Sequence, residues 1–375
     1  MAGSLCFLAI GAMQAMYGPA FPAFLRRFDV GVGEVGAIVS AHFLGSFVTI
    51  AASGVLIVRV GYRRLLAAGA FTAALGAVGI AASPAWGIAL AAAFLGGLGF
   101  GLLDVGTNLL FARAYGARAS GALNLLNALF GLGAVVGPLL VGAFAPRVGP
   151  AFLLVGALFM AVAATMARAP AMPAPLVVQR GAPRLPLAPL AGFLMLYFLY
   201  VSSEVGVASW EPTYLAPVLG ASTAAFLTSL YWGSLTLGRV LAAAVSDRMR
   251  PADLVLGALL LALVGAWVAV VTPLAPVAYA VVGLAFGPVF PTALAWLQEV
   301  FPRRAERVAP IVIAGASLGP VASAPAIGWV VARSGTGDVP VVLGGVVLAT
   351  AVAAGVLWWG ARRRPEALAA EEALG

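Results

Sequence analysis

Apolar runs of about twenty residues recur along the whole chain, and short polar or glycine- and proline-containing segments separate them. About twenty apolar residues are enough for a helix to cross the ~30 Å hydrocarbon core of a bilayer. The pattern predicts an all-α polytopic membrane protein with twelve transmembrane helices. We expect these spans near residues 4–25, 34–57, 65–83, 86–112, 119–145, 149–168, 188–213, 222–246, 252–271, 275–298, 306–332 and 338–361.

The composition excludes a soluble domain and argues against binding to nucleic acid. Hydrophobic residues make up 63% of the chain and charged residues 9%, whereas about a quarter of a soluble domain is charged. All 21 basic residues are arginines, and they lie in short loops rather than in one patch, so the net charge of +8 does not indicate a nucleic-acid surface. A single cysteine, Cys6, leaves no intrachain disulfide and no cysteine metal site.

The arginines also predict the orientation of the spans. With both termini placed in the cytoplasm, the inside loops carry sixteen arginines and the outside loops carry four, which are Arg26, Arg27, Arg147 and Arg333. This bias agrees with the positive-inside rule. We expect a multi-pass protein of a prokaryotic cell (inner) membrane, without a cleavable signal peptide.

A proline-rich segment and weak internal repeats divide the chain into two six-helix bundles, at 1–168 and 188–375. Residues 169–187 hold five prolines and read as a cytoplasmic linker, and the second bundle ends in a short tail. Gly97-Leu-Gly-Phe-Gly101 recurs as Gly283-Leu-Ala-Phe-Gly287, and two further short matches have similar offsets. Such ordered matches favour a duplicated unit.

One carboxylate lies inside the fourth apolar run. At helical spacing, Gly97, Gly101, Asp104 and Asn108 share one face. A charge at the bilayer centre costs about 2.5–17 kcal/mol, so such an acid is expected to face a protein interior or cavity. We therefore interpret Asp104 as a proton-carrying group beside a bound substrate, the other interpretation being a structural carboxylate satisfied by its neighbours.

Several motifs resemble those of major facilitator transporters. The segment Gly54-Val-Leu-Ile-Val-Arg59-Val-Gly-Tyr-Arg-Arg64 is similar to the signature loop of that family, with Val58 where the family has an acid, and the second half keeps the acid as Asp247-Arg248. The family fold would consist of two pseudo-symmetric six-helix bundles, and the resemblance implies gate or ion-pair roles for Arg59, Asp247 and Arg248.

Four further segments resemble the fucose-permease-type branch of sugar–proton symporters. They are Gly101-Leu-Leu-Asp-Val-Gly-Thr-Asn108, Leu123-Asn-Leu-Leu-Asn-Ala-Leu-Phe-Gly-Leu-Gly133, Tyr200-Val-Ser-Ser-Glu204 with Trp210 and Tyr214, and Tyr231-Trp-Gly-Ser-Leu-Thr-Leu-Gly-Arg239. A departure is Gln14, because fucose-type members carry an acid in the first span.

The candidate site residues divide by chemistry. Asp104 and Glu204 are the candidates for proton coupling, while Glu211, beside Pro212, is expected to be solvated. Arg239 is either a gate partner or a site residue, and it needs a counter-ion such as Asp247, Asp104 or an anionic substrate. Candidate substrate contacts, each with helix packing as the other interpretation, are Gln14, His42, Asn108, Asn124, Asn127, Tyr200, Trp210, Tyr231 and Trp232.

These features predict a secondary transporter that works by alternating access, most simply a proton-coupled importer of a monosaccharide or similar neutral polar solute. An exporter of amphipathic or anionic compounds is the first alternative, and a lipid scramblase is a distant one. No metal pairing, Ser-His-Asp set or nucleotide loop indicates an enzyme. We expect a monomer in the lipid bilayer whose partners are its substrate and a proton, with no cofactor.

Overall fold

The computed structural model describes residues 2–116, 119–169, 186–302 and 304–363. Every regular element in these ranges is helical. In the first part of the chain the helices are α1 (Ala2–Phe28), α2 (Val32–Val35), α3 (Ala37–Ala82), α4 (Trp86–Tyr115), α5 (Ala119–Phe144) and α6 (Gly149–Ala167). In the second part they are α7 (Leu187–Leu219), α8 (Ala221–Val245), α9 (Pro251–Val268), α10 (Ala275–Phe286), α11 (Val289–Val300), α12 (Ala305–Ala316), α13 (Leu318–Ser334) and α14 (Val339–Arg363). Three short 3-10 helices, η2 (Ser246–Arg248), η3 (Thr272–Leu274) and η4 (Thr336–Asp338), lie in the connections.

The prediction of twelve spans is confirmed. Ten helical segments are long and apolar enough to cross a membrane, and one of them, Val32–Ala82, has 51 residues. This segment contains two passes, because Gly61 has a φ of 75° and ψ of 161° and turns the chain there. The twelfth pass is α8, which packs between α5 and α10 and buries polar residues such as Thr228 and Ser229.

Two predicted spans are each built from two helices. The span near 275–298 consists of α10 and α11, which are separated by Gly287 and Pro288. A proline lacks the N–H that would continue the helical hydrogen bonds. A Cβ on Gly287 would stand 2.5 Å from the Leu235 carbonyl oxygen and 2.6 Å from the Arg239 nitrogen. Glycine therefore permits the close approach of α10 to α8. The span near 306–332 is divided between α12 and α13 at Ser317.

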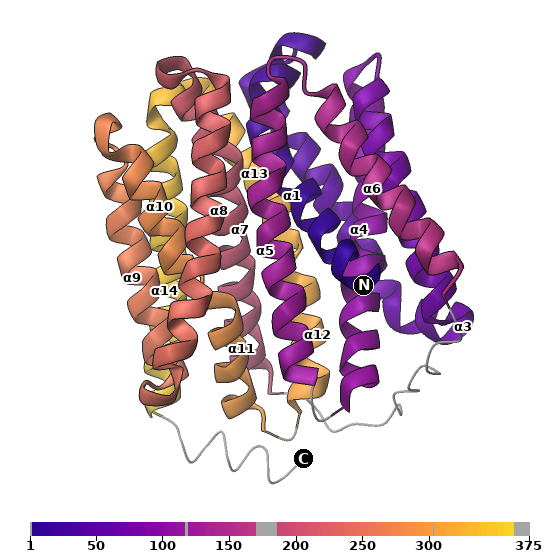
Figure 1. The fold of residues 1–375 in the computed structure, drawn as a ribbon. Coiled ribbons are helices and arrows are strands. Elements are labelled where there is room, and N and C mark those ends of the chain that lie inside the picture. Colours follow the sequence, from indigo (N-terminus) through magenta and orange to yellow (C-terminus); the bar gives the residue numbers. More distant parts are fainter. Residues whose placement is uncertain (1, 117–118, 170–185, 303, 364–375) are drawn as a thin grey trace.

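Helices α1 to α6 contact one another extensively, as do α7 to α14, and the main contacts between the two sets involve four helix pairs. These are α5 with α8, α1 with α7, and α13 with both α2 and α3. Figure 1 shows α9 and α14 at one edge, α3, α4 and α6 at the other, and α5 beside α8 between them. The domain boundaries at 168 and 188 stay a prediction, because most of the linker, residues 170–185, lies outside the described ranges.

One end of the molecule is closed by contacts between the two sets of helices. We call this end the closed face; it contains the end of α1, α2 and the end of α13, at the top of Figure 1. Ser40 of α3 donates a hydrogen bond to the Val321 carbonyl at 2.8 Å. Gly36 lies against the Ala324 carbonyl, and Gly18 of α1 lies against the backbone of α7. Small residues let these backbones approach closely.

The opposite end contains the bend of α3 at Gly61. Gly54, Gly61, Gly116 and Gly121 have no neighbouring heavy atom within 4 Å of the place that a Cβ would occupy. Arg59, Arg63 and Arg64 near the bend of α3 are exposed. We call this the arginine-rich end.

We expect Gly36→Val to weaken the closed face, because its side chain would overlap the Ala324 backbone. Overpacking of this kind costs about 1–3 kcal/mol. The melting temperature in detergent should fall, and spin labels on Gly31→Cys and Ser334→Cys should move further apart, as measured by electron–electron double resonance.

Gly257→Val is the matched control, because Gly257 lies within α9 and has open space around it. It should leave both the melting temperature and the label distance at parent values. If Gly36→Val also left both unchanged, the closed face would not depend on this contact.

Candidate functional site

Asp104 lies on α4 with part of its side chain exposed. The Asn108 side-chain amide, one turn later, donates to the Asp104 Oδ1 and to its backbone carbonyl, both at 3.0 Å. Among the described residues no arginine forms an ion pair with this carboxylate. On the same predicted stripe, Gly97 and Gly101 lie against the backbone of α3. Their close packing with α3 holds α4 in place. The Asp104 side chain itself stays partly exposed.

The first span runs close to this carboxylate. Cys6 of α1 and Thr107 of α4 are in contact through their Sγ and Oγ1 atoms, 3.6 Å apart. A Cβ on Gly3 would meet Phe111 and Thr107, so the first turns of α1 pack directly on α4. Gln14, two to three turns further along α1, is half-buried.

His42 is a buried packing residue in this structure, with an exposed fraction of 0%. Its Nδ1 is hydrogen-bonded to the Tyr17 hydroxyl at 3.1 Å, and its Nε2 has no hydrogen-bond partner among the described residues. The ring lies edge-on to Phe100, with centroids 5.2 Å apart. His42 thus joins α1, α3 and α4 and has no exposed atom that could contact a solute.

Glu204 of α7 and Arg239 of α8 lie within electrostatic range of each other. The guanidinium of Arg239 is the cation that acts electrostatically on the carboxylate of Glu204, but the two groups do not form an ion pair. Glu204 is 7% exposed, and the Nε of Arg239 is buried without a hydrogen-bond partner. Because these two charged side chains do not contact each other, they keep hydrogen-bonding groups that a bound solute could use.

Tyrosines surround this pair and tie it to the neighbouring helices. The Tyr231 hydroxyl donates to the backbone carbonyl of Glu204 at 3.0 Å. The Tyr200 hydroxyl donates to the Phe286 carbonyl at 3.0 Å, which connects α7 to α10. Both side chains are buried, so in this conformation they position the helices around Glu204.

The two candidate tryptophans are buried, and their indole N–H groups are unused. Trp210 packs edge-on against Phe21 of α1, with ring centroids 5.3 Å apart, and therefore belongs to the contact that closes one end. Trp232 packs against Tyr231 at 5.4 Å. Neither Nε1 has a hydrogen-bond partner among the described residues.

Asn124 and Asn127 are exposed on the first half of α5. The Asn127 amide donates to its own helix, at the Leu123 carbonyl (3.0 Å). Gly131, one turn after Asn127 on the same face, lies against Thr236 of α8. The two asparagines are therefore directed to the side on which α8 lies, towards the arginine-rich end, and their polar atoms are accessible.

The arrangement is a helical membrane protein with interior acids in both sets of helices and side-chain amides in the first set, closed at one end. A model of the Major Facilitator Superfamily matches residues 3–309 of the 375. The chain belongs to the Major Facilitator Superfamily. It is accordingly a multi-pass membrane protein of a transporter family.

Solved structures of such transporters share the fold over nearly the whole chain. A variant of the nucleoside transporter NupG is 12% identical, with 95% of this chain and 98% of that chain covered and a TM-score of 0.79. A bacterial homolog of the human lysosomal transporter Spinster, inward-facing and unoccupied, is 14% identical, with 96% of each chain covered and a TM-score of 0.77.

The E. coli fucose:proton symporter FucP in its outward conformation is 16% identical, with 95% and 97% covered and a TM-score of 0.65. No curated protein sequence matches the chain. At these identities the likeness extends to the fold and not to the substrate.

Of the predicted gate residues of this transporter, Arg239 lies within electrostatic range of Glu204. Arg59 and Arg248 are exposed, and the side chain of Asp247 lies outside the described part of the chain. None of the described carboxylates forms an ion pair with Arg239. The signature-loop roles of Arg59, Asp247 and Arg248 stay predictions.

The prediction of a solvated Glu211 is wrong. This side chain has an exposed fraction of 0%, and neither carboxylate oxygen has a hydrogen-bond partner among the described residues. Thr228 is the nearby hydroxyl, but it donates to the Ala224 carbonyl at 3.2 Å. Tyr279 of α10, whose hydroxyl is also without a partner, is within electrostatic range.

The sequence did contain a signal for this burial. Glu211 follows Glu204 by seven residues, so the two acids share one face of α7. Pro212 does not end the helix, which continues to Leu219. The proline led to the inference of a helix end and therefore of solvent.

The Tyr17–His42 contact gives a direct test of this packing. Tyr17→Phe removes the hydroxyl and leaves both ring nitrogens of the buried His42 without a partner, which costs about 1–3 kcal/mol. Differential scanning fluorimetry in detergent should show a clear fall in melting temperature. Tyr115→Phe, at a residue 51% exposed, is the control and should change stability by less than about 0.5 kcal/mol. Equal effects of the two variants would contradict a structural role for this hydrogen bond.

Proposed function

We propose that this transporter couples the movement of protons to uptake of a monosaccharide or similar neutral polar solute by alternating access. Asp104 is the group that we propose takes up and releases the proton. The observation that carries this proposal is an interior carboxylate that is partly exposed, accepts one amide hydrogen bond and has no arginine partner. A carboxylate already paired with a cation would have little reason to exchange protons.

The depth of Asp104 supports this role. It precedes Arg113 by nine residues, which places it about 13 Å of helix from the arginine-rich end. A permanent charge at such depth is costly, so it is rare in a span without a function. Glu204, on the other set of helices, is the second candidate for the proton. Because it forms no ion pair with Arg239, its carboxylate can take up and release a proton.

The contacts of the closed face suit alternating access. They join the two sets of helices through glycine-to-backbone packing and single hydrogen bonds such as that from Ser40 to Val321. Contacts of this kind can separate as rigid surfaces without unfolding either set. Both termini would lie in the cytoplasm of a prokaryotic cell, as the sixteen-to-four distribution of arginines indicates. The closed face would then be the outer one.

A neutral substrate agrees with the accessible polar groups. Asn124 and Asn127 offer amide donors and acceptors without charge, and Asn108 beside Asp104 and the half-buried Gln14 of α1 add two more. The four segments that resemble fucose-permease-type transporters also support a sugar. Among structures with the same fold, FucP is a fucose:proton symporter and NupG is a nucleoside transporter.

An exporter of anionic compounds is the second candidate, and Arg239 favours it. Its Nε is buried and has no hydrogen-bond partner among the described residues, so an anionic group could supply one. Substrate-stabilised melting distinguishes the two candidates. Shifts with hexoses support the importer, and shifts only with anionic or amphipathic compounds support the exporter.

The coupling itself is tested in proteoliposomes with a solute that stabilises the protein. We expect an imposed inward proton gradient to drive accumulation of the solute by the parent. Asp104→Asn, which has the same shape and cannot titrate, should reduce gradient-driven accumulation to the level of empty liposomes. It should retain exchange of internal for external solute, because exchange needs no net proton movement.

Asp338→Asn is the matched control, since Asp338 is exposed and lies in η4 at the closed face, at the end of a span. It should behave as the parent in both assays. Accumulation by Asp104→Asn that still follows the proton gradient would refute Asp104 as the coupling group.

A further inference from the structure

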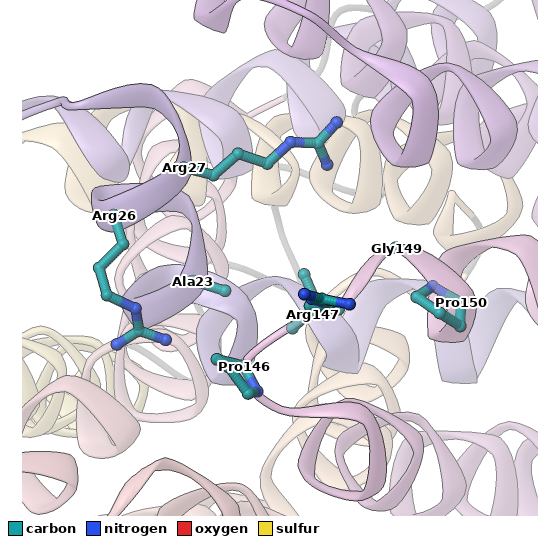
Figure 2. Close-up of a pocket in the computed structure, with 8 residues that line it drawn as sticks. Ala23, Arg26, Arg27, Pro146, Arg147, Gly149 and Pro150 are labelled. Atoms are coloured by element: carbon teal, nitrogen blue, oxygen red, sulfur yellow. The ribbon is translucent and has the colours of Figure 1, made fainter.

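A pocket of about 390 Å³ lies at the closed face, beside the end of α1 and the start of α6. The loop between α5 and α6 forms its floor together with the last turns of α1. Figure 2 shows that Arg26, Arg27 and Arg147 lie around this pocket with Pro146 and Gly149. The pocket is separate from the candidate transport site, because none of the residues that line it carries a predicted substrate or proton role.

The charge of this pocket is unusual for its position. Of the four arginines in the predicted outside loops, three line the one pocket. Loops on that side of a membrane are generally poor in arginine. Arginine side chains placed close together repel each other, and an anion bound between them would lower this repulsion. The cluster therefore indicates a bound counter-ion.

The described chain does not supply that counter-ion. Arg26 and Arg147 are exposed and form no hydrogen bond or ion pair through their side chains with the described residues. Arg27 is held by carbonyl groups at the end of α3, at 2.9 Å from Ala81 and 2.6 Å from Ser83. These carbonyls fix the guanidinium in place without cancelling its charge.

The two acids near the pocket, Asp29 and Glu34, do not form ion pairs with its arginines among the described residues. Glu34 accepts the Gly31 backbone N–H at 3.1 Å. Asp29, two residues after Arg27, is exposed and forms no ion pair with the described arginines. The pocket therefore keeps an excess of positive charge.

Two further features place this charge at the level of lipid headgroups. The first turn of α6 begins at Gly149 in the pocket wall, and the N-terminus of a helix favours an anion. Phe28 and Trp86 pack together beside the arginines, with ring centroids 5.5 Å apart. Aromatic residues of this kind are enriched where a membrane protein meets the headgroup region.

We propose that this pocket binds a phosphate group, supplied by the headgroup of an anionic phospholipid in the leaflet at the closed face. Arg26 and Arg147 would donate hydrogen bonds to the phosphate oxygens, which arginine can do in a bidentate manner. Arg27 would contribute fixed charge. Ala23, Val148 and Pro150 give the pocket apolar walls that a glycerol backbone can contact. Free inorganic phosphate has the same charged group but lacks this apolar part.

The test measures lipid binding and does not need the transported solute. The purified, delipidated transporter is titrated with phosphatidylglycerol, with zwitterionic phosphatidylcholine or with inorganic phosphate, and bound lipid is counted by native mass spectrometry. We expect phosphatidylglycerol to bind at least about tenfold more tightly than phosphatidylcholine. Its binding should weaken as ionic strength rises, because exposed charges are screened by salt.

The double variant Arg26→Gln/Arg147→Gln should weaken phosphatidylglycerol binding at least about tenfold. Arg333→Gln is the matched control: Arg333 lies at the same face but stacks on Trp329, with its Cζ 3.6 Å from the ring centroid. This variant should bind phosphatidylglycerol as the parent does. Because Arg26 and Arg147 are exposed, the double variant is expected to fold. The single variant Arg147→Glu provides a second test, because it reverses the charge at one of these positions.

Three results would overturn the proposal. Equal losses in the pocket variants and in Arg333→Gln would mean that binding depends on the general charge of this face. Unchanged binding in the double variant and in Arg147→Glu would mean that lipid binds elsewhere. Inorganic phosphate that competes fully with phosphatidylglycerol at equal concentration would identify a free-anion site and overturn the lipid assignment.

Discussion

The cost of placing a charge in hydrocarbon decides where the acids and arginines of this transporter lie. Most of its arginines lie in loops or at helix ends, whereas Asp104, Glu204, Glu211 and Arg239 lie within the bundle. Each of these four must be balanced by a partner, by access to water or by loss of its charge. Asp104 has an amide partner and partial exposure, and Glu204 has a cation nearby but not in contact. In the proposed mechanism, these incompletely balanced charges are the groups that respond to a proton.

Glycine is the second constraint, because it decides how closely the helices approach. Gly97 and Gly101 bring α4 onto α3 within the first set of helices, and Gly287 brings α10 onto α8 within the second. Gly18 and Gly36 act between the sets, at the closed face. The same small residue thus makes close contacts both inside each set and between the two sets. A transporter that moves its two sets as bodies needs both kinds of contact.

The sequence was sufficient for most of the fold, since length and apolarity define a membrane span almost completely. It placed Asp104 and Asn108 on one helix face, one turn apart, and the contact between them belongs to the alternative interpretation of Asp104 as a structural carboxylate. It could not predict which buried aromatic residues serve packing: Tyr200 and Tyr231 both donate to carbonyls of distant residues, and such contacts depend on how helices far apart in the chain meet. Glu211 was misjudged because a proline was read as a helix end, although spanning helices tolerate proline when neighbours satisfy the backbone.

The central claim is that Asp104 exchanges its proton while it stays within the bundle. Infrared difference spectroscopy on the reconstituted transporter measures this most directly, by comparing carboxyl bands in mildly acidic and mildly alkaline buffer. The account predicts a protonated-carboxyl band that appears on acidification and is absent from Asp104→Asn. A spectrum in which Asp104→Asn loses no such band would contradict it, because the acid would then keep one protonation state throughout.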